Sequence, residues 1–205
     1  MLSWILCLPW LAAHVNAQEA VQRVRVTTSL GAFVIALEAQ RAPVAVAEFL
    51  RYVEDGHYTG TLIHRVAGDD LLEGGGYSRP DYQQKPAHEP VRLDDGKCLQ
   101  NLRGTAALAR SGPGPKGVVE DFYINLKDNL GLDPYCSNYR VFGRVVDGFE
   151  VIERIRVVPT GKVGPFRKNA PLTPIVIERI EHLDPHAQAG FRIQALPSMR
   201  ASARG

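Results

Sequence analysis

The segment TLIHRVAGDDLLEGGGY, residues 61–77, gathers side chains that could do chemistry. His64 and Arg65 are adjacent in a run that starts with β-branched and apolar residues, and Asp70 and Glu73 follow shortly after. A guanidinium pairs with a carboxylate through two parallel hydrogen bonds, so an ion pair is the simplest use of these residues. The alternative is an arginine whose charge acts on a substrate while the nearby acids tune it. The histidine could in turn suggest a general base.

Several common catalytic signatures are absent from the sequence. It contains no G-x-S-x-G, H-E-x-x-H, P-loop or EF-hand pattern. His57, His88 and His182 show no clustering that suggests a metal site. Cys98 and Cys136 lie outside any C-x-x-C motif, so nothing indicates a redox role.

The composition is that of an ordinary globular protein. The chain has 205 residues, of which 45% are hydrophobic and 22% are charged. These values favour one domain with a substantial core. The formal net charge of +2 is close to balance, so composition gives no reason to expect nucleic acid or an anionic membrane as a partner.

The first residues are typical of a cleaved export signal. The apolar run from Leu2 to Ala13 is too short to span a bilayer, and Val15 and Ala17 are small residues where a signal peptidase reads. No Lys or Arg precedes the run, so an uncleaved anchor or a buried N-terminal helix remains the alternative. We expect a periplasmic or secreted protein without stable membrane insertion after residues 1–17 are removed.

Export affects the expected state of the cysteines. Cys7 would leave with the signal, and Cys98 and Cys136 would meet an oxidising compartment. A disulfide requires a Cα separation that the sequence cannot supply. A disulfide and two isolated thiols therefore both stay open.

Hydrophobic periodicity predicts many short strands and two helices. Strands are indicated at residues 24–29, 33–38, 61–66, 71–73, 105–109, 122–125, 141–146 and 175–182. Helical spacing of apolar residues indicates helices at residues 42–55 and 148–155. Short strands with long loops fit a closed antiparallel barrel, because closure removes exposed edges, although the pattern alone does not distinguish a barrel from a sandwich.

Three segments are expected to be irregular. Residues 76–100 are rich in charge and proline, and residues 111–117 hold three glycines and two prolines. Apolar periodicity ends at Leu183, so residues 184–205 are expected to form a disordered tail. Residues 18–183 remain as the folded domain.

Five stretches of the chain occur in the order and spacing of one known family. They are IHRV…LLEGGG (63–76), NLRGTAALAR (101–110), DFYIN (121–125), YRVFGRVVDGFEVIERI (139–155) and the run from VPTGKVGPF to PIVIERIEHL (158–183). In these stretches the sequence resembles the cyclophilin-type peptidyl-prolyl cis-trans isomerases, and among them the bacterial periplasmic ones. The resemblance implies a mainly β fold, namely a closed eight-stranded antiparallel β-barrel capped by two α-helices. It also implies that no metal or other cofactor is used.

The resemblance implies that Arg65 is the catalytic residue. Rotation of an X-Pro bond crosses a barrier of about 18–20 kcal/mol because partial double-bond character is lost. The twisted prolyl nitrogen regains a basic lone pair, so a guanidinium beside it stabilises the twisted state more than the planar one. No proton is transferred, so we expect His64 to be a packed structural residue on the opposite face of its strand. The alternative for Arg65 is a surface ion-pair residue.

The proline pocket implied by the resemblance departs from the family pattern. The family lines it with a phenylalanine, a methionine, a second phenylalanine and a leucine, and the matched residues here are Asp70, Leu71, Tyr123 and Leu132. The two leucines preserve apolar contact, whereas Tyr123 adds a hydroxyl that needs a partner. A carboxylate at position 70 offers no apolar packing and prefers water.

Four further positions complete the implied peptide-binding surface. Ala109 and Arg110 belong to it, and Tyr139 stands where the family often has a histidine. Gly131 replaces an aromatic residue and so opens the rim of the pocket. The loss of that ring disfavours tight binding of cyclosporin-type macrocycles.

The second departure from the family is electrostatic. Two family glutamines map to Glu73 and Asp121, and a small residue before the latter becomes Glu120. With Asp70, up to four carboxylates would face Arg65. Glu73 would either pre-position the guanidinium or reduce its field at the prolyl nitrogen, and we favour the second effect. An acidic groove predicts a preference for Lys or Arg beside the proline, unless the two adjacent aspartates form a solvated turn that points away.

Two main functions remain after this comparison. The first is a peptidyl-prolyl isomerase that acts, as a monomer, on proline-containing segments of unfolded or exported proteins. The second is a cyclophilin-fold module that binds such peptides with weak or lost catalysis. Arg65, Leu71 and Leu132 favour the enzyme, whereas Asp70 and Glu73 favour the binding module. We adopt the enzyme; a third possibility, that function lies in the basic tail, would leave the folded domain as a structural partner.

Overall fold

The computed structural model describes residues 21–89, 98–111 and 118–183. The predicted export signal, the predicted tail and most of the glycine-rich loop lie outside the described residues. Within them the strands are β1 (Arg23–Thr28), β2 (Gly31–Leu37), β3 (Thr61–Val66), β4 (Leu71–Ser78), β5 (Thr105–Ser111), β6 (Val118–Asn125), β7 (Tyr139–Asp147), β8 (Thr160–Val163), β9 (Phe166–Pro171) and β10 (Ile175–Leu183). The helices are α1 (Pro43–Glu54), α2 (Phe149–Arg156) and the 3-10 helix η2 (Leu130–Tyr135).

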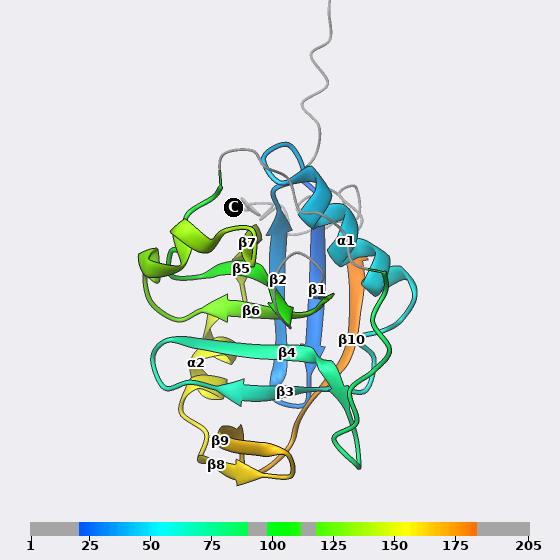
Figure 1. Ribbon diagram of the computed structural model, residues 1–205, viewed down its shortest axis with the longest axis vertical. Coiled ribbons are helices and arrows are strands. Elements are labelled where there is room, and N and C mark those ends of the chain that lie inside the picture. The colour runs from blue at the N-terminus through cyan, green and yellow to red at the C-terminus, as the bar shows by residue number, and fades with distance from the viewer. Residues whose placement is uncertain (1–20, 90–97, 112–117, 184–205) are drawn as a thin grey trace, which may run out of the picture.

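Eight of these strands close into one antiparallel barrel (Figure 1). The order around the barrel is β1-β10-β3-β4-β6-β5-β7-β2, and each strand pairs antiparallel with its neighbours. Closure gives each of the eight strands a hydrogen-bonding partner on both sides. The predicted eight-stranded barrel is confirmed.

Two amphipathic helices pack against the barrel at different ends of the view in Figure 1. Pro43 begins α1, where its missing N–H costs no helical hydrogen bond. Phe49 of α1 is buried and stacks on Phe142 of β7, with the two ring centroids 4.4 Å apart. α2 buries its apolar face through Val151, Ile152 and Ile155. No helix in the described part of the chain is long and apolar enough to cross a membrane.

β4 is longer than the sequence pattern suggested, because it continues through three glycines. The alternation predicts a strand that ends at Glu73, whereas β4 runs on to Ser78. A Cβ on Gly74 would lie 2.6 Å from the carbonyl oxygen of Leu62, so only glycine lets β3 and β4 approach this closely. The glycines that suggest the end of a strand in the sequence are therefore what allows β4 to pair with β3.

β8 and β9 form a separate two-stranded sheet that the sequence pattern did not predict. Most of their residues are exposed or half-buried, so the alternation of buried and exposed side chains that marks a strand is weak. Phe166 at the start of β9 stacks on the His64 ring of β3, with centroids 5.1 Å apart. The hairpin thus covers one side of the segment that carries Arg65.

Candidate functional site

A row of side chains crosses four adjacent strands of the barrel. Arg65 of β3 is paired with Glu73 of β4, Glu73 with Tyr123 of β6, and Tyr123 with Ala107 of β5. Residues directly opposite one another on neighbouring strands project from the same face of a sheet. The barrel therefore brings the predicted arginine, its predicted acidic neighbour and the predicted pocket ring to one face.

Arg65 is held by one carboxylate. Its Nη1 lies 2.9 Å from Oε2 of Glu73, within hydrogen-bond range. The arginine side chain is 45% exposed and that of Glu73 is 17% exposed. The guanidinium thus lies at the solvent boundary with part of its donor edge open, while the acid that binds it is mostly enclosed.

His64 departs from strict strand alternation. Ile63 pairs with Gly74, and Arg65 pairs with Glu73. β3 therefore has one residue more than β4 between these two pairs, and that residue, His64, forms a β-bulge. The expectation that His64 lies on the opposite face is wrong, because the bulge turns it toward Glu73. Its expected burial holds, since the ring is packed between aromatic side chains. Burial, with a smaller contribution from the Arg65 charge, lowers the pKa of His64 to about 4.

Asp121 is buried on β6, two residues before Tyr123, and accepts a backbone hydrogen bond. Its Oδ1 is 2.7 Å from the amide nitrogen of Gly76. A Cβ on Gly76 would come 2.9 Å from the same oxygen, so glycine makes room for the carboxyl group. Burial, reinforced by the charge of Glu73, raises the pKa of Asp121 to about 8. At neutral pH the group is therefore mostly protonated and adds little negative charge near Arg65.

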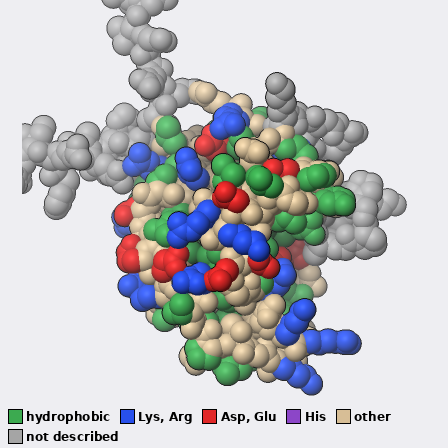
Figure 2. All heavy atoms as spheres, turned by 90° about the vertical axis from the view of Figure 1, so that its left-hand side faces the viewer, with side chains coloured by type: hydrophobic (Ala, Val, Ile, Leu, Met, Phe, Trp, Pro, Cys, Tyr) green, Lys and Arg blue, Asp and Glu red, His purple; other side chains and the backbone are tan. Residues whose placement is uncertain are grey.

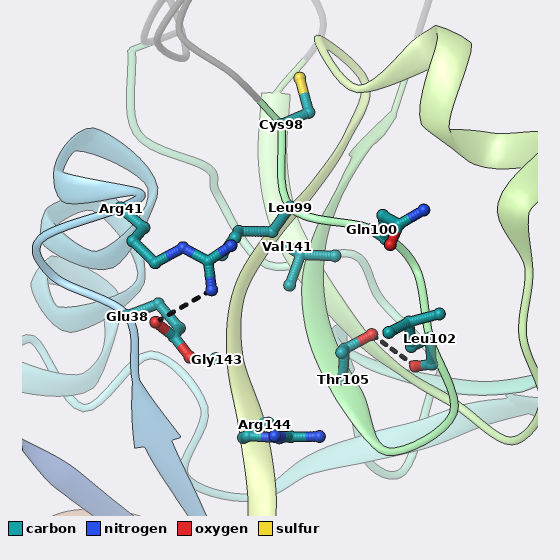
Figure 3. A pocket seen from close by; sticks show the side chains of 10 residues that line it. All are labelled: Glu38, Arg41, Cys98, Leu99, Gln100, Leu102, Thr105, Val141, Gly143 and Arg144. Carbon is teal, nitrogen blue, oxygen red and sulfur yellow. Dashed lines mark hydrogen bonds and ion pairs between the residues drawn. The ribbon is translucent and has the colours of Figure 1, made fainter.

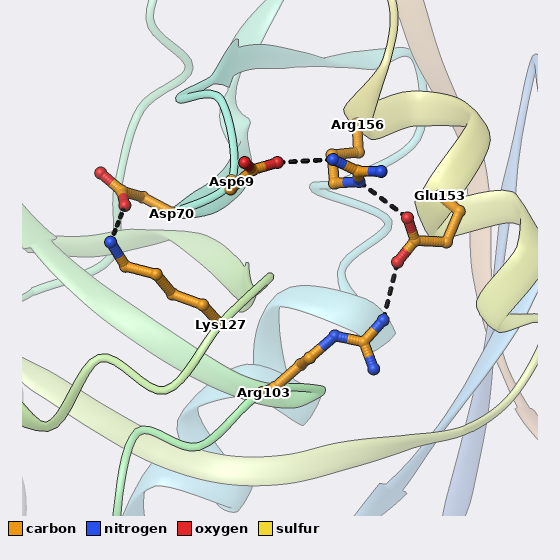
Figure 4. A network of polar contacts seen from close by, with 6 residues as sticks. All are labelled: Asp69, Asp70, Arg103, Lys127, Glu153 and Arg156. Carbon is orange, nitrogen blue, oxygen red and sulfur yellow. Dashed lines mark hydrogen bonds and ion pairs between the residues drawn. The ribbon is translucent and has the colours of Figure 1, made fainter.

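The two other predicted acidic neighbours of Arg65 contact other side chains. Glu120 is buried and accepts a hydrogen bond of 2.5 Å from Nε2 of Gln84. Asp70 is exposed and its Oδ1 lies 2.5 Å from Nζ of Lys127 (Figure 4). Four carboxylates around Arg65 are therefore not what the structure shows, because Asp70 and Glu120 each contact a different partner.

The turn between β3 and β4 is tied to α2 by ion pairs. Asp69 lies 2.5 Å from Arg156, and Arg156 lies 2.7 Å from Glu153 of the same helix. Arg103 contacts Glu153 at 2.8 Å and extends the chain of contacts seen in Figure 4. Figure 2 shows acidic and basic side chains interspersed over this face. The turn is thus a charge-balanced surface feature. This agrees with the solvated turn that the sequence analysis gave as the alternative to an acidic groove.

The apolar part of the site comes from several elements. Leu71, Leu132 and Tyr139 are half-buried and pack against the core, and Ala109 is buried. The rings of Tyr123 and Tyr139 meet edge to face, with centroids 6.3 Å apart. These five residues are the apolar pocket positions implied by the resemblance. Arg110 lies in β5, but its side chain falls outside the described part of the structure.

The hydroxyl of Tyr123 finds the partner that its burial requires. It donates to Oδ1 of Asn101 at 2.7 Å, and the same oxygen accepts from Nδ2 of Asn125 at 3.1 Å. Nδ2 of Asn101 donates in turn to Oδ1 of Asp133 in η2 at 3.0 Å. Asn101 thereby joins β6 to the helix that carries Leu132, a positioning role that the sequence analysis missed. A polar Asn within NLRGTAALAR is the one available signal, and its burial could not be inferred without the fold.

The segment before β5 and η2 are also joined covalently. Cys98 and Cys136 form a disulfide with a Cα–Cα distance of 6.1 Å, which decides between the two states left open by the sequence. Gly131 of η2 is exposed, and a Cβ there would meet no atom within 4 Å. There is therefore room for a side chain at position 131, and glycine leaves that space open.

A separate pocket lies between the segment that precedes α1, residues 98–102 and strands β5 and β7 (Figure 3). Its lining residues are Glu38, Arg41, Cys98, Leu99, Gln100, Leu102, Thr105, Val141, Gly143 and Arg144. None of the residues predicted for the site lines it. The pocket is therefore separate from the predicted peptide-binding site around Arg65.

Comparison with known proteins places this geometry in a family. Residues 23–182 match the family described as "Cyclophilin type peptidyl-prolyl cis-trans isomerase/CLD". The chain is 43% identical to peptidyl-prolyl cis-trans isomerase A of Dickeya dadantii over 157 residues, which cover 76% of this chain and 81% of the relative. It is 35% identical to peptidyl-prolyl cis-trans isomerase B of Escherichia coli over 158 residues, which cover 75% and 94% of the two chains.

The fold agrees with a solved member of the same family. A cyclophilin-type isomerase of Cryptosporidium parvum, crystallised in the presence of the dipeptide Ala-Pro, superposes with a TM-score of 0.63 at 23% identity. The match covers 80% of this chain and 99% of that one. The chain therefore belongs to the cyclophilin-type peptidyl-prolyl cis-trans isomerases, and its enzymatic activity is that of an isomerase.

Proposed function

We propose that Arg65 is the electrostatic catalyst of X-Pro rotation in this chain. The observation that carries the proposal is the position of its guanidinium, which is part-exposed on the same barrel face as Leu71 and Tyr123. A proline ring held against these apolar side chains would have its nitrogen within reach of the arginine. Hydrogen bonding to that nitrogen favours the twisted bond over the planar one.

The charge balance of the site supports this role for the arginine. Neutral His64 and mostly protonated Asp121 leave Glu73 as the acid in direct contact with Arg65 among the described residues. The guanidinium is thus positioned by a single carboxylate and keeps donor capacity for a substrate. Because Asp69 and Asp70 pair with cations, their charges give little basis for a preference for Lys or Arg beside the proline.

We further propose that the substrates are proline-containing segments of exported proteins during folding. The apolar run before Ala17 supports export. The Cys98–Cys136 disulfide is in keeping with it, because disulfides persist mainly in oxidising compartments. We propose that the catalytic unit is a monomer, because Arg65, Glu73 and Tyr123 lie together on one face of a single barrel. N-terminal sequencing of the protein from a periplasmic extract tests this directly: a start at Gln18 supports export, whereas a start at Met1 in the cytoplasmic fraction contradicts it.

The catalytic proposal is tested by cis-to-trans conversion of a proline tetrapeptide with the chain lacking residues 1–17. Wild type should accelerate the conversion and Arg65→Ala should lose most of that acceleration. Arg179→Ala is the matched control, because Arg179 also forms an exposed ion pair, at 2.7 Å with Glu181, on β10. Equal rates for wild type and Arg65→Ala would reject the role of the arginine. Peptide binding without acceleration by wild type would instead favour the binding module.

A further inference from the structure

His64 carries a buried nitrogen that lacks a hydrogen-bond partner. The side chain is 8% exposed and is packed by the rings of Tyr77 and Phe166. Its Nδ1 has no hydrogen bond within the described structure, and the nearest acidic oxygen, Oδ1 of Asp121, is 3.8 Å away. That distance is too long for a hydrogen bond. An unpaired buried polar atom is unusual in native proteins, so its surroundings point to a function.

Two carboxylates converge on this nitrogen. One imidazole nitrogen of His64 and one oxygen each of Glu73 and Asp121 all lie within 4.8 Å of one another, and Nδ1 is the nitrogen 3.8 Å from Oδ1 of Asp121. First-row transition ions bind imidazole nitrogen and carboxylate oxygen at about 2.0–2.2 Å. An ion placed between the three atoms therefore requires each to move by only about 1 Å. The β-bulge on β3 and the glycine beneath Asp121 are what make this convergence possible.

We propose that His64, Glu73 and Asp121 form a binding site for a divalent transition-metal ion of the Zn²⁺ type. An imidazole nitrogen selects such ions over Mg²⁺ and Ca²⁺, which prefer oxygen ligands throughout. Three protein ligands leave a fourth position of a tetrahedral ion open to solvent. The site lies beside the arginine of the proposed active site and does not depend on that arginine being catalytic.

The ion and Arg65 would compete for the same acid. Glu73 is the 2.9 Å partner of the guanidinium and also a member of the metal set. Each cation weakens binding of the other to one carboxylate, and such coupling is reciprocal by thermodynamic linkage. Metal binding therefore releases Arg65 from Glu73, and removal of Arg65 makes Glu73 a better ligand.

The other acid-paired histidine provides a matched control. Nε2 of His88 lies 2.9 Å from Oδ2 of Asp55, which is a hydrogen-bonded pair with a single carboxylate. No further His, Cys, Asp or Glu side chain among the described residues completes a metal set there. Loss of this histidine should leave metal binding unchanged.

The test is a Zn²⁺ titration of the untagged chain lacking residues 1–17, in competition with a chromophoric zinc chelator. The Cys98–Cys136 disulfide is kept intact so that thiolates do not bind the ion. Wild type should take up one equivalent of Zn²⁺. His64→Gln, Glu73→Gln and Asp121→Asn should each weaken binding by at least about tenfold, and His88→Gln should not. Arg65→Ala should tighten binding, the opposite direction to the three ligand variants.

Several results would overturn the proposal. Failure of wild type to compete with the chelator would do so, as would ligand variants that bind Zn²⁺ as tightly as wild type does. If His64→Gln does not fold, as judged by thermal unfolding, the isosteric changes at Glu73 and Asp121 decide the question. The affinity for Zn²⁺ is measured without the isomerase assay. Evidence that Arg65 is not catalytic would therefore leave the metal-binding result unaffected.

Discussion

Glu73 holds Arg65 across the β3–β4 pair, with Oε2 of the acid 2.9 Å from Nη1 of the arginine. The acid is 17% exposed and the arginine 45% exposed, so the acid is the more fixed of the two. A neutral amide at position 73 could still accept a hydrogen bond from the guanidinium but would not neutralise its charge. Under the role proposed for Arg65, the ion pair orders the guanidinium at the cost of part of its electrostatic effect on a prolyl nitrogen.

Glu73→Gln is expected to raise the turnover of a proline tetrapeptide. The substitution keeps an acceptor for Arg65 and removes the opposing charge. Part-exposed ion pairs are worth up to about 1 kcal/mol, so the increase should not exceed about fivefold. The measurement is the initial rate of cis-to-trans conversion at saturating peptide.

Glu181→Gln serves as the control for that experiment, because Glu181 forms an ion pair with Arg179 outside the site. Its turnover should equal that of wild type. An unchanged rate for Glu73→Gln would contradict the weakening effect of the carboxylate, and a lower rate would show that the carboxylate positions Arg65 productively.

Asp70→Phe is expected to improve peptide binding. The resemblance matches Asp70 to a position that the family fills with an aromatic ring, and the carboxylate of Asp70 contacts Lys127 on the surface. A phenyl ring partly buried against a bound proline should contribute about 1 kcal/mol, which lowers KM about fivefold. The check is KM for the same tetrapeptide.

The neighbouring residue gives the matched control for this change. Asp69→Phe introduces the same ring one position earlier, where the native side chain contacts Arg156 instead. Its KM should stay close to that of wild type. Equal effects of the two substitutions would mean that position 70 does not face the peptide.

Most of the barrel could be predicted because its strands carry local signals. The bounds expected for β3 agree with the structure, and the expected α1 and α2 differ by about one residue at each end. β4 was cut short because glycine pairing depends on the close approach of β3, a contact between strands. The β8–β9 hairpin was missed because its exposed strands leave no alternating pattern.

The sequence predicted which residues belong to the site better than it predicted the contacts that they make. Arg65 and Glu73 could be paired from their motif positions, and the structure brings them together. The partners of Asp70 and Glu120 could not be predicted, because Lys127 and Gln84 are distant in sequence. The bulge that turns His64 toward Glu73 is likewise a property of strand register and not of residue type.

Removal of the disulfide should destabilise the fold. Cys98 and Cys136 are separated by 38 residues. Closing a loop of that length lowers the conformational entropy of the unfolded chain, which raises the free energy of unfolding by about 3–4 kcal/mol. The double variant Cys98→Ser and Cys136→Ser should lose a similar free energy of unfolding in urea. An unfolding midpoint equal to that of the oxidised wild type would contradict the expectation.

Acid should destabilise the protein through His57. Burial, with the nearby Lys85 and His88 charges, lowers the pKa of His57 to about 4 from the usual 6.5. Between these two pH values the unfolded chain binds the proton more readily than the folded chain does. The contribution of His57 to the free energy of unfolding is therefore complete above pH 6.5 and is lost as the pH falls toward 4. The loss from this group is on the order of 3 kcal/mol.

The measurement for this prediction is the free energy of unfolding at several pH values between 4 and 7. His57→Gln should show a smaller loss over that range than wild type does. His182→Gln is the control because its imidazole is exposed, and it should lose stability as wild type does. Parallel curves for all three proteins would rule out His57 as a source of the acid sensitivity.

The most direct test of the account separates turnover from binding in Arg65→Ala. We predict that kcat for a proline tetrapeptide falls at least about a hundredfold, which corresponds to about 2.7 kcal/mol of lost transition-state stabilisation. The peptide dissociation constant, measured by NMR titration, should change by much less, because the substitution leaves the proposed apolar contacts with Leu71, Tyr123 and Leu132 in place. A fall in affinity with an unchanged kcat would contradict the account, since it would make Arg65 a binding residue and leave the catalysis to another group.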